Sequence, residues 1–362
     1  MDRQLDYELK FHTFGCKVNT YDTGLIQKNL SPQKSDSIST SNTIGNLSPQ
    51  IHVLNTCAVT QEATKEAVKL IKKLKKNDPT CKVVVTGCGA QVDTDSFTES
   101  FVGSDLVVAN SHKGLLPQII DQHLRGENTE RVFKSNIFKK EDLEIGGGIE
   151  DSHTRSFLKI QDGCNSFCTY CIIPFARGKS RSIPILQLVD RVNELHLQGI
   201  KEVVITGIHI ADYEDDSQGE VQYLDDLIEA LLKQTQMPRF RISSLEPKEL
   251  TDRLLELYQD ARLCPHFHLS IQSANDLVLE KMKRRYRQQE VIRILNRIEA
   301  KVKNAFIGMD VITGFNYESA QAFDETYKVL ADHYWTKIHV FPYSERPGTF
   351  AMKLDESIPL QE

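Results

Sequence analysis

Short apolar runs alternate with helical patterns along nearly the whole chain, and this alternation constrains the fold more than any other feature. In the first third, three β-rich runs occur at 9–15, 51–56 and 82–87. Between the last two lies QEATKEAVKLIKKLKKN, in which apolar residues recur at helical spacing. Strands that alternate with helices are typical of a parallel sheet covered by helices. The sequence therefore predicts an α/β fold that begins with a doubly wound parallel-sheet domain.

Six further strand–helix units follow in the second half of the chain. Their strand candidates lie at 157–161, 203–206, 240–244, 267–271, 309–313 and 337–341. Because eight such units close a full barrel, six units predict a partial (β/α)6 barrel. The intervening residues 127–151 are charged and contain three consecutive glycines, which is typical of a linker. We therefore expect an N-terminal domain over 1–126, a linker over 127–151 and a barrel domain over 152–362.

Composition and hydropathy narrow the class of protein. The chain has 362 residues, of which 40% are hydrophobic and 26% charged, as expected of a globular protein with two cores. It contains no run of eighteen apolar residues and no N-terminal signal core, so we expect no membrane segment and a cytoplasmic location. The net charge of −6 disfavours indiscriminate nucleic-acid binding but permits a local basic patch.

Three of the eight cysteines stand at the ends of the three N-terminal strands. Because the carboxyl ends of parallel strands share one edge of a sheet, we expect Cys16, Cys57 and Cys88 (the N-terminal trio) to converge there. Eight cysteines in a chain without a secretion signal favour metal or redox chemistry over disulfides. The alternative is that the trio consists of small buried apolar side chains, a frequent role of free cysteine.

A second group, Cys164, Cys168 and Cys171 (the barrel trio), lies in GCNSFCTYC directly after the first barrel strand. Thiolates at this spacing are typical of iron–sulfur or zinc ligation. A structural zinc site needs a fourth ligand, and the sequence has no second C-x2-C or H-x3-H pair to supply it. A four-iron cluster held by three cysteines instead leaves one iron open to chelate a small molecule. We therefore expect the open coordination position on this iron to be the functional part of the site.

The barrel trio, with Tyr170 between its last two cysteines, resembles the signature of radical S-adenosylmethionine enzymes. Within that superfamily the chain is similar to the methylthiotransferases. The matching stretches are FGCKVNTYDT, NTCAVT, TGCGAQ, KIQDGCNSFCTYCIIPFARGKSRS, SSLEP, FHLSIQS and FPYSERPGT. They occur in family order, and the first, second and fourth look most like the branch that acts on N6-threonylcarbamoyladenosine of tRNA.

This resemblance implies two 4Fe–4S clusters, one on the barrel trio that binds S-adenosylmethionine and an auxiliary one on the N-terminal trio that carries the sulfur. Cleavage of S-adenosylmethionine would yield a 5′-deoxyadenosyl radical, and a methylthio group would enter at C2 of the adenosine at position 37, next to the anticodon. The attacked C–H bond has no acidic proton, so we expect no catalytic acid or base. An electron-donor protein of the flavodoxin or ferredoxin type is implied as a partner, besides tRNA.

Candidate contacts to S-adenosylmethionine lie beside the barrel trio and at the ends of the barrel strands. They are Tyr170, Thr206, Gly207, Ser243, Ser244, Glu246, Gln272 and Ser273. The alternative for the strand-end residues is ordinary capping of a strand.

Basic residues in two stretches are candidates for contacts to RNA phosphates. They are Arg177, Lys179, Arg181, Arg284 and Arg285. The alternatives are a solvated helix face for the last two and pairing with a cofactor carboxylate for the others.

Three other functions stay open from the sequence. Two use the same chemistry, on N6-isopentenyladenosine of tRNA or on a ribosomal protein. The third is a non-catalytic RNA-binding protein with structural zinc. The family usually ends in a small β-barrel RNA-binding domain, and because this sequence stops at AMKLDESIPLQE, we expect that domain to be absent.

Overall fold

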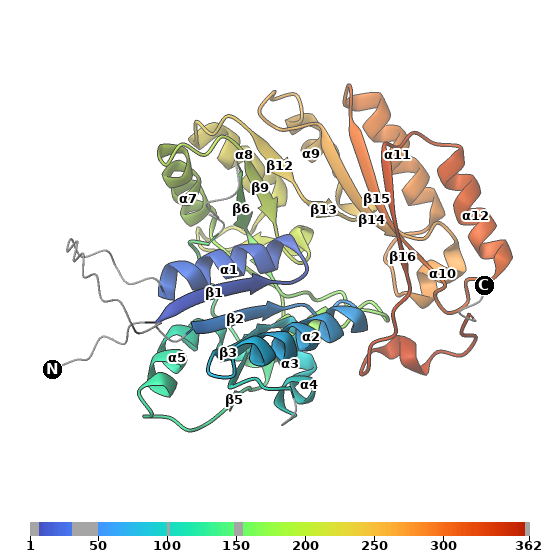
Figure 1. Cartoon of the computed structure of the whole chain (residues 1–362). Helices are drawn as coiled ribbons and strands as arrows, with labels where there is room; N and C mark the ends of the chain where they lie inside the picture. The colour runs from blue at the N-terminus through green and yellow to red at the C-terminus, as the bar shows by residue number, and fades with distance from the viewer. Residues whose placement is uncertain (1–6, 31–49, 100–101, 148–154, 359–362) are drawn as a thin grey trace. The chain divides into compact units, whose positions relative to one another are not determined.

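The computed structural model describes residues 7–30, 50–99, 102–147 and 155–358, which fall into two compact units (Figure 1). The first unit comprises Met1–Gly148 and Phe175–Gly178, and the second comprises Ile149–Pro174 and Lys179–Glu362. Within the described ranges, no helix is both long and apolar enough to cross a lipid bilayer.

The first unit is built on a five-stranded parallel sheet in the order β1-β2-β3-β4-β5. Its strands are β1 (Glu8–Thr13), β2 (Gln50–Thr56), β3 (Lys82–Gly87), β4 (Leu106–Ala109) and β5 (Val132–Phe133). Its helices are α1 (Lys17–Leu30), α2 (Gln61–Asn77), α3 (Cys88–Val92), α4 (Thr94–Thr98) and α5 (Leu116–Leu124). Short 3₁₀ helices lie at Asn110–Leu115 and Ile137–Lys139.

Helices cover both faces of this sheet, which confirms the predicted doubly wound α/β domain. Ile51 and Val53 of β2 belong to a core with α1 and α5, whereas Leu54 belongs to a core with α2, α3 and α4. Successive strand residues point to opposite faces, so a strand buried on both sides must be apolar throughout. Helix α2 begins after Thr60, whose side chain accepts a hydrogen bond from the Ala63 amide, and it buries Ala67 and Ile71 against the sheet.

The predicted linker is shorter in the structure than in the sequence. Residues 127–147 belong to the first unit, because Val132–Phe133 pairs in parallel with β4 and Ile137 is buried. A two-residue strand shows no periodicity, so the charged composition around it dominates the sequence signal. Residues 148–151 lie outside the described residues.

The second unit contains the six predicted strands, arranged in two parallel sheets with the orders β12-β9-β6 and β13-β14-β15-β16. Because the third of them is divided, they form seven strands: β6 (Ser156–Lys159), β9 (Val203–Thr206), β12 (Phe240–Ile242), β13 (Ser244–Leu245), β14 (His266–Gln272), β15 (Phe306–Thr313) and β16 (Lys337–Pro342). The third predicted strand is interrupted at Ser243, so that β12 pairs with β9 whereas β13 pairs with β14. One strand thus joins the two sheets, as a curved, open barrel requires.

Helices follow the barrel strands in sequence. They are α6 (Ile173–Arg177), α7 (Ile185–Leu197), α8 (Leu224–Gln234), α9 (Asp252–Leu257), α10 (Asp276–Lys281), α11 (Gln288–Lys301) and α12 (Ala320–Ala331). Two-stranded antiparallel ribbons are formed by β7 (Gln161–Asp162) with β8 (Arg181–Ser182), and by β10 (Glu214–Asp215) with β11 (Gln222–Tyr223). Short 3₁₀ helices lie at Ile210–Asp212, Pro247–Glu249 and Phe350–Lys353.

Candidate active site

The N-terminal trio lies at one edge of the first sheet. Strands β1, β2 and β3 are adjacent and parallel, so their carboxyl ends share that edge. Cys57 directly follows β2, Cys88 opens α3 directly after β3, and Cys16 lies in the turn between β1 and α1. Cys57 and Cys88 are buried, whereas Cys16 is exposed. The sequence placed the three cysteines at strand ends, and the structure brings them to one edge.

Two glycines allow the loops of this trio to approach one another. Gly15 has a φ of +92°, and a Cβ at that position would lie 2.7 Å from the Sγ of Cys57. Gly87 has a φ of +96°, and a Cβ there would lie 2.4 Å from the carbonyl oxygen of Thr56. Both positions need the left-handed region and the missing side chain, which only glycine provides without strain. The fit of the trio therefore depends on these two residues.

Burial raises the pKa of the Cys57 thiol to about 11, and the neighbouring thiolates of Cys88 and Cys16 raise it further, whereas a hydrogen bond from the Val59 amide opposes them. A positively charged metal group binds thiolates and displaces their protons, so it would offset this cost at Cys57. The donor set and the space kept by Gly15 fit an iron–sulfur cluster held by three cysteines.

The barrel trio lies on the loop between β7 and α6, in the second unit. The Cys171 amide donates to the Cys168 carbonyl in a tight turn, and the Ser166 amide donates to Cys164 Sγ at 3.4 Å. Thr169 holds the turn in place, because its amide donates to the Met282 carbonyl and its hydroxyl to that of Lys281. The loop is thus attached to the end of α10.

Burial raises the pKa of the Cys171 thiol to about 12, with a further contribution from the Cys168 thiolate. Burial likewise raises the pKa of Cys168, although the Arg284 guanidinium opposes it. Arg284 donates from Nη1 to Cys168 Sγ at 3.5 Å and to Glu246, and from Nη2 to the Ser270 carbonyl at 2.7 Å. A buried cation therefore stands beside the barrel trio.

Two of the predicted RNA contacts are buried in this structure. Arg284 is buried among the groups just described, and Arg177 is buried against Cys88, Asn19 and Asp22. Neither guanidinium is accessible to a phosphate. Lys179 and Arg285 are exposed, and Arg181 is half-buried with Nη1 donating to the Lys179 carbonyl.

The predicted S-adenosylmethionine contacts lie near the carboxyl ends of the barrel strands. Thr206 and Ser243 are buried, and a Cβ at Gly207 would lie 3.0 Å from the Gln161 carbonyl oxygen. Ser244 begins β13, and Gln272 ends β14 with a φ of +63°. Glu246 faces Arg284.

Two of these candidates have structural partners. The Ser273 hydroxyl is hydrogen-bonded with that of Thr326 and accepts a hydrogen bond from the backbone amide of Asn275. These bonds are those expected if Ser273 caps the strand end instead of binding S-adenosylmethionine. Tyr170 packs edge-to-face on Phe315, beside an apolar cluster.

His209, which lies on the loop after β9, was not among the predicted site residues. Its Nδ1 is 3.1 Å from Asp212 and 4.0 Å from Cys164 Sγ, and its Nε2 is 2.5 Å from Glu249. Burial alone would lower the pKa of His209, but hydrogen bonds to Asp212, Cys164 and Glu249 raise it well above its ordinary value. The only prior signal was a histidine three residues after a predicted strand end.

His209 also brings a different kind of metal ligand close to Cys164. Ligand atoms of Cys164, His209 and Asp212 all lie within 4.8 Å of one another. Cys164 is the one member of the barrel trio in this group, so the group offers three ligands, and a closed tetrahedral zinc site would need a fourth.

Two family models match the chain. Residues 158–330 match the radical SAM superfamily, and residues 8–109 match a family described as uncharacterized protein family UPF0004. The first match spans the barrel trio and the second spans the N-terminal trio. Among solved structures, the radical S-adenosylmethionine methyltransferase TsrM from Kitasatospora setae superposes with a TM-score of 0.61, covering 81% of this chain and 63% of its own, at 12% identity. That similarity shows the fold.

Curated relatives match nearly the full length of the chain. Proteins named threonylcarbamoyladenosine tRNA methylthiotransferase are 36% identical in both Rickettsia prowazekii and Aquifex aeolicus; they match 95% and 97% of this chain and 77% and 84% of their own lengths. A Staphylococcus epidermidis protein named tRNA-2-methylthio-N(6)-dimethylallyladenosine synthase is 30% identical over 96% of this chain and 68% of its own. The chain is accordingly an enzyme of the radical S-adenosylmethionine methylthiotransferase family, which implies a 4Fe–4S cluster and S-adenosylmethionine.

Proposed function

We propose that this protein inserts a methylthio group at C2 of N6-threonylcarbamoyladenosine in tRNA. The observation that carries the proposal is a pair of cysteine trios, each at the carboxyl end of parallel strands in its own unit. Radical chemistry alone needs one cluster, whereas transfer of sulfur needs a second group that holds it. The relatives named for threonylcarbamoyladenosine are 36% identical and the one named for dimethylallyladenosine is 30% identical, which favours the former base.

Residues around the barrel trio would bind and orient the cofactor. When bound there, the cluster supplies the electron that cleaves S-adenosylmethionine. Gln161 fixes the loop, because its amide donates to the Gly163 carbonyl and accepts from the backbone of Ile208 and His209. Arg284 offers a buried positive charge, which suits the carboxylate of the methionine group once Glu246 is displaced or shared.

The N-terminal trio would hold the auxiliary cluster. The convergence of its thiols and the space kept by Gly15 support this assignment. No residue is needed as a general base, because the attacked carbon of the adenine carries no acidic proton.

Exposed cations would bind the tRNA backbone. Lys179, Arg181 and Arg285 keep this role, since they lie at the surface or half-buried. The partner that delivers electrons would be a flavodoxin or ferredoxin type protein, and a tRNA substrate would place the reaction in the cytoplasm.

The proposal is tested with anaerobically reconstituted protein, S-adenosylmethionine, a reductant and tRNA that carries either modified adenosine. About eight irons with matching sulfide per chain are expected, and digestion followed by mass spectrometry is expected to show the methylthio form of N6-threonylcarbamoyladenosine. C168A is the control, and it should stay folded and lose cleavage of S-adenosylmethionine.

Other products would identify the alternatives. Methylthiolation of only the isopentenyl form, or of a ribosomal protein, would replace the substrate and keep the chemistry. About four irons per chain would mean that the protein holds one cluster and that the N-terminal trio holds none. Zinc in place of iron, together with unfolding of C168A, would mean a structural zinc protein.

A further inference from the structure

Arg177 lies at the end of α6, in the segment Phe175–Gly178 that belongs to the first unit. Its side chain is 2% exposed. The Nε–H donates to Cys88 Sγ at 3.2 Å, and Nη2 donates to Asn19 at 2.6 Å and to Asp22 at 3.1 Å. The guanidinium therefore contacts a sulfur of the N-terminal trio directly and reaches α1 with its other end.

Asn19 extends this contact to the other two cysteines. Its Nδ2 donates to the Phe14 carbonyl at 2.7 Å and to the Thr56 carbonyl at 3.1 Å. Phe14 lies two residues before Cys16, and Thr56 immediately precedes Cys57. Arg177 and Asn19 thus form one hydrogen-bonded unit that touches the loops of all three cysteines.

Asn110 fixes the backbone of the arginine segment beside Cys88. Its Nδ2 donates to the Ala176 carbonyl at 2.9 Å and to Cys88 Sγ at 3.7 Å. Cys88 Sγ consequently accepts from two N–H groups on different elements.

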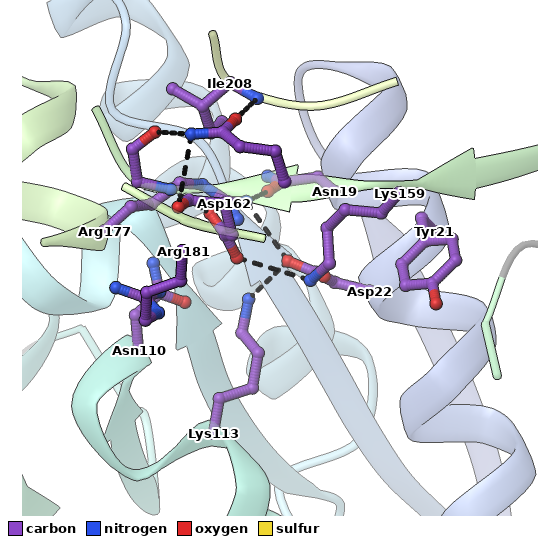
Figure 2. A network of polar contacts seen from close by, with 12 residues as sticks. Asn19, Tyr21, Asp22, Asn110, Lys113, Lys159, Asp162, Arg177, Arg181 and Ile208 are labelled. Carbon is purple, nitrogen blue, oxygen red and sulfur yellow. Dashed lines mark hydrogen bonds and ion pairs between the residues drawn. The ribbon is translucent and has the colours of Figure 1, made fainter. Parts of the chain in front are cut away.

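A buried ion-pair network anchors Arg177. Asp22 pairs with both Arg177 and Lys113, whose Nζ lies 3.0 Å from the same carboxylate oxygen (Figure 2). All three side chains are largely buried. The network therefore fixes a guanidinium beside Cys88, and such a group suits an anionic partner.

We propose that Arg177 is a positioning residue for the auxiliary cluster, so that the segment after the barrel trio completes the site on the N-terminal trio. N–H groups that donate to cluster sulfurs, and a positive charge nearby, stabilise the reduced cluster and raise its potential. Partners that orient metal ligands also raise the affinity for the metal, commonly by tenfold to a hundredfold, so their removal is expected to speed the loss of the metal. This inference rests on the auxiliary cluster of the proposed function.

The test uses the full chain with Cys164, Cys168 and Cys171 changed to alanine, so that the N-terminal trio carries any remaining iron. In this parent we expect about four irons. R177Q is expected to lose iron to a chelator roughly tenfold faster or more, with a more negative midpoint potential in an EPR-monitored titration. R177K keeps the positive charge but lacks the planar guanidinium, so its chelation rate and midpoint potential should lie between those of the parent and of R177Q.

R191Q is the matched control, since Arg191 is also a buried arginine paired with a carboxylate, on α7. It should leave the chelation rate and the potential as in the parent. If R177Q does not fold by circular dichroism, R177K carries the test alone, and a parent-like chelation rate there would refute the inference. If the parent holds four irons and R177Q has the same chelation rate and potential, only the role of Arg177 is refuted. If the parent holds no iron, both the auxiliary cluster and the role of Arg177 are refuted.

Discussion

His209 Nδ1 lies 4.0 Å from the sulfur of Cys164, so an imidazole stands beside the barrel trio. The same ring bridges two acidic groups, Asp212 on one side and Glu249 on the other. His209 therefore holds together carboxylates that would otherwise repel one another next to the cysteine loop.

Removing this imidazole is expected to disturb the cluster on the barrel trio. In H209A, Asp212 and Glu249 lose their shared cation, so the loop should open and iron should fall from about eight toward four per chain. H209Q still donates one hydrogen bond and should retain more iron. Iron content and the EPR signal of the reduced protein measure this effect. Loss of zinc, with iron unchanged, would instead assign Cys164, His209 and Asp212 to a zinc site.

Arg284 and Arg285 are neighbours in sequence and opposite in exposure, which separates two roles. R284Q leaves Glu246 and Cys168 without their buried cation, so we expect cleavage of S-adenosylmethionine to fall roughly tenfold to a hundredfold. R285Q removes an exposed charge, so it should leave cleavage without tRNA unchanged.

Binding of tRNA should be affected by R285Q. The substitution should weaken tRNA binding at low salt and lessen the salt dependence of that binding, because a phosphate contact releases counterions. Filter binding at several salt concentrations measures both. Equal cleavage by R284Q and the parent would contradict the role of Arg284, and unchanged salt dependence in R285Q would contradict that of Arg285.

The strands of both units could be predicted because their signal is local. Runs such as KVVVTG carry their periodicity within six residues, and β3 occupies Lys82–Gly87 as expected. By contrast, β5 has two residues and is defined by its pairing with β4, which no local pattern contains. The local sequence pattern therefore cannot separate β5 from the linker predicted over 127–151.

The site was predictable to the extent that it depends on strand ends. Cysteines at the ends of adjacent parallel strands must share an edge, and they do. Burial of a guanidinium depends on long-range partners instead. Arg177 meets Asn19 from 158 positions away, and Arg284 meets Cys168 from 116 away, so both looked like surface cations in the sequence.

The first unit should lose stability in mild acid. His12 and His52 are hydrogen-bonded at 3.0 Å. Burial, and then the nearby Lys10, lowers the pKa of both below 6.5, although Asp78 and Glu8 partly oppose this at His52. Below pH about 6.5, the histidines of the unfolded chain bind more protons than those of the folded chain. The free energy of unfolding is therefore highest above that pH, and it falls as the pH drops toward the lower pKa values of the folded state. Denaturant midpoints of cluster-free, reduced protein at pH 7.5 and 5.5 measure this loss. H12Q combined with H52Q should flatten it, and an equal loss in the double variant would refute the assignment.

Gly15 offers the most direct test of how the N-terminal trio is packed. In G15A the new Cβ would meet Cys57 Sγ at 2.7 Å, so the two loops must separate and the auxiliary cluster should be lost. We expect iron to fall from about eight to about four per chain, with cleavage of S-adenosylmethionine retained and methylthiolation abolished. The matched control is G126A, because Gly126 also has a positive φ, of +71°, but a Cβ there meets nothing within 4 Å. Both substitutions carry the backbone cost of about 1–2 kcal/mol for the left-handed region, so a difference in iron content between them reports the contact with Cys57. Equal iron in G15A and G126A would mean that the approach of Gly15 to Cys57 is not required to hold the cluster.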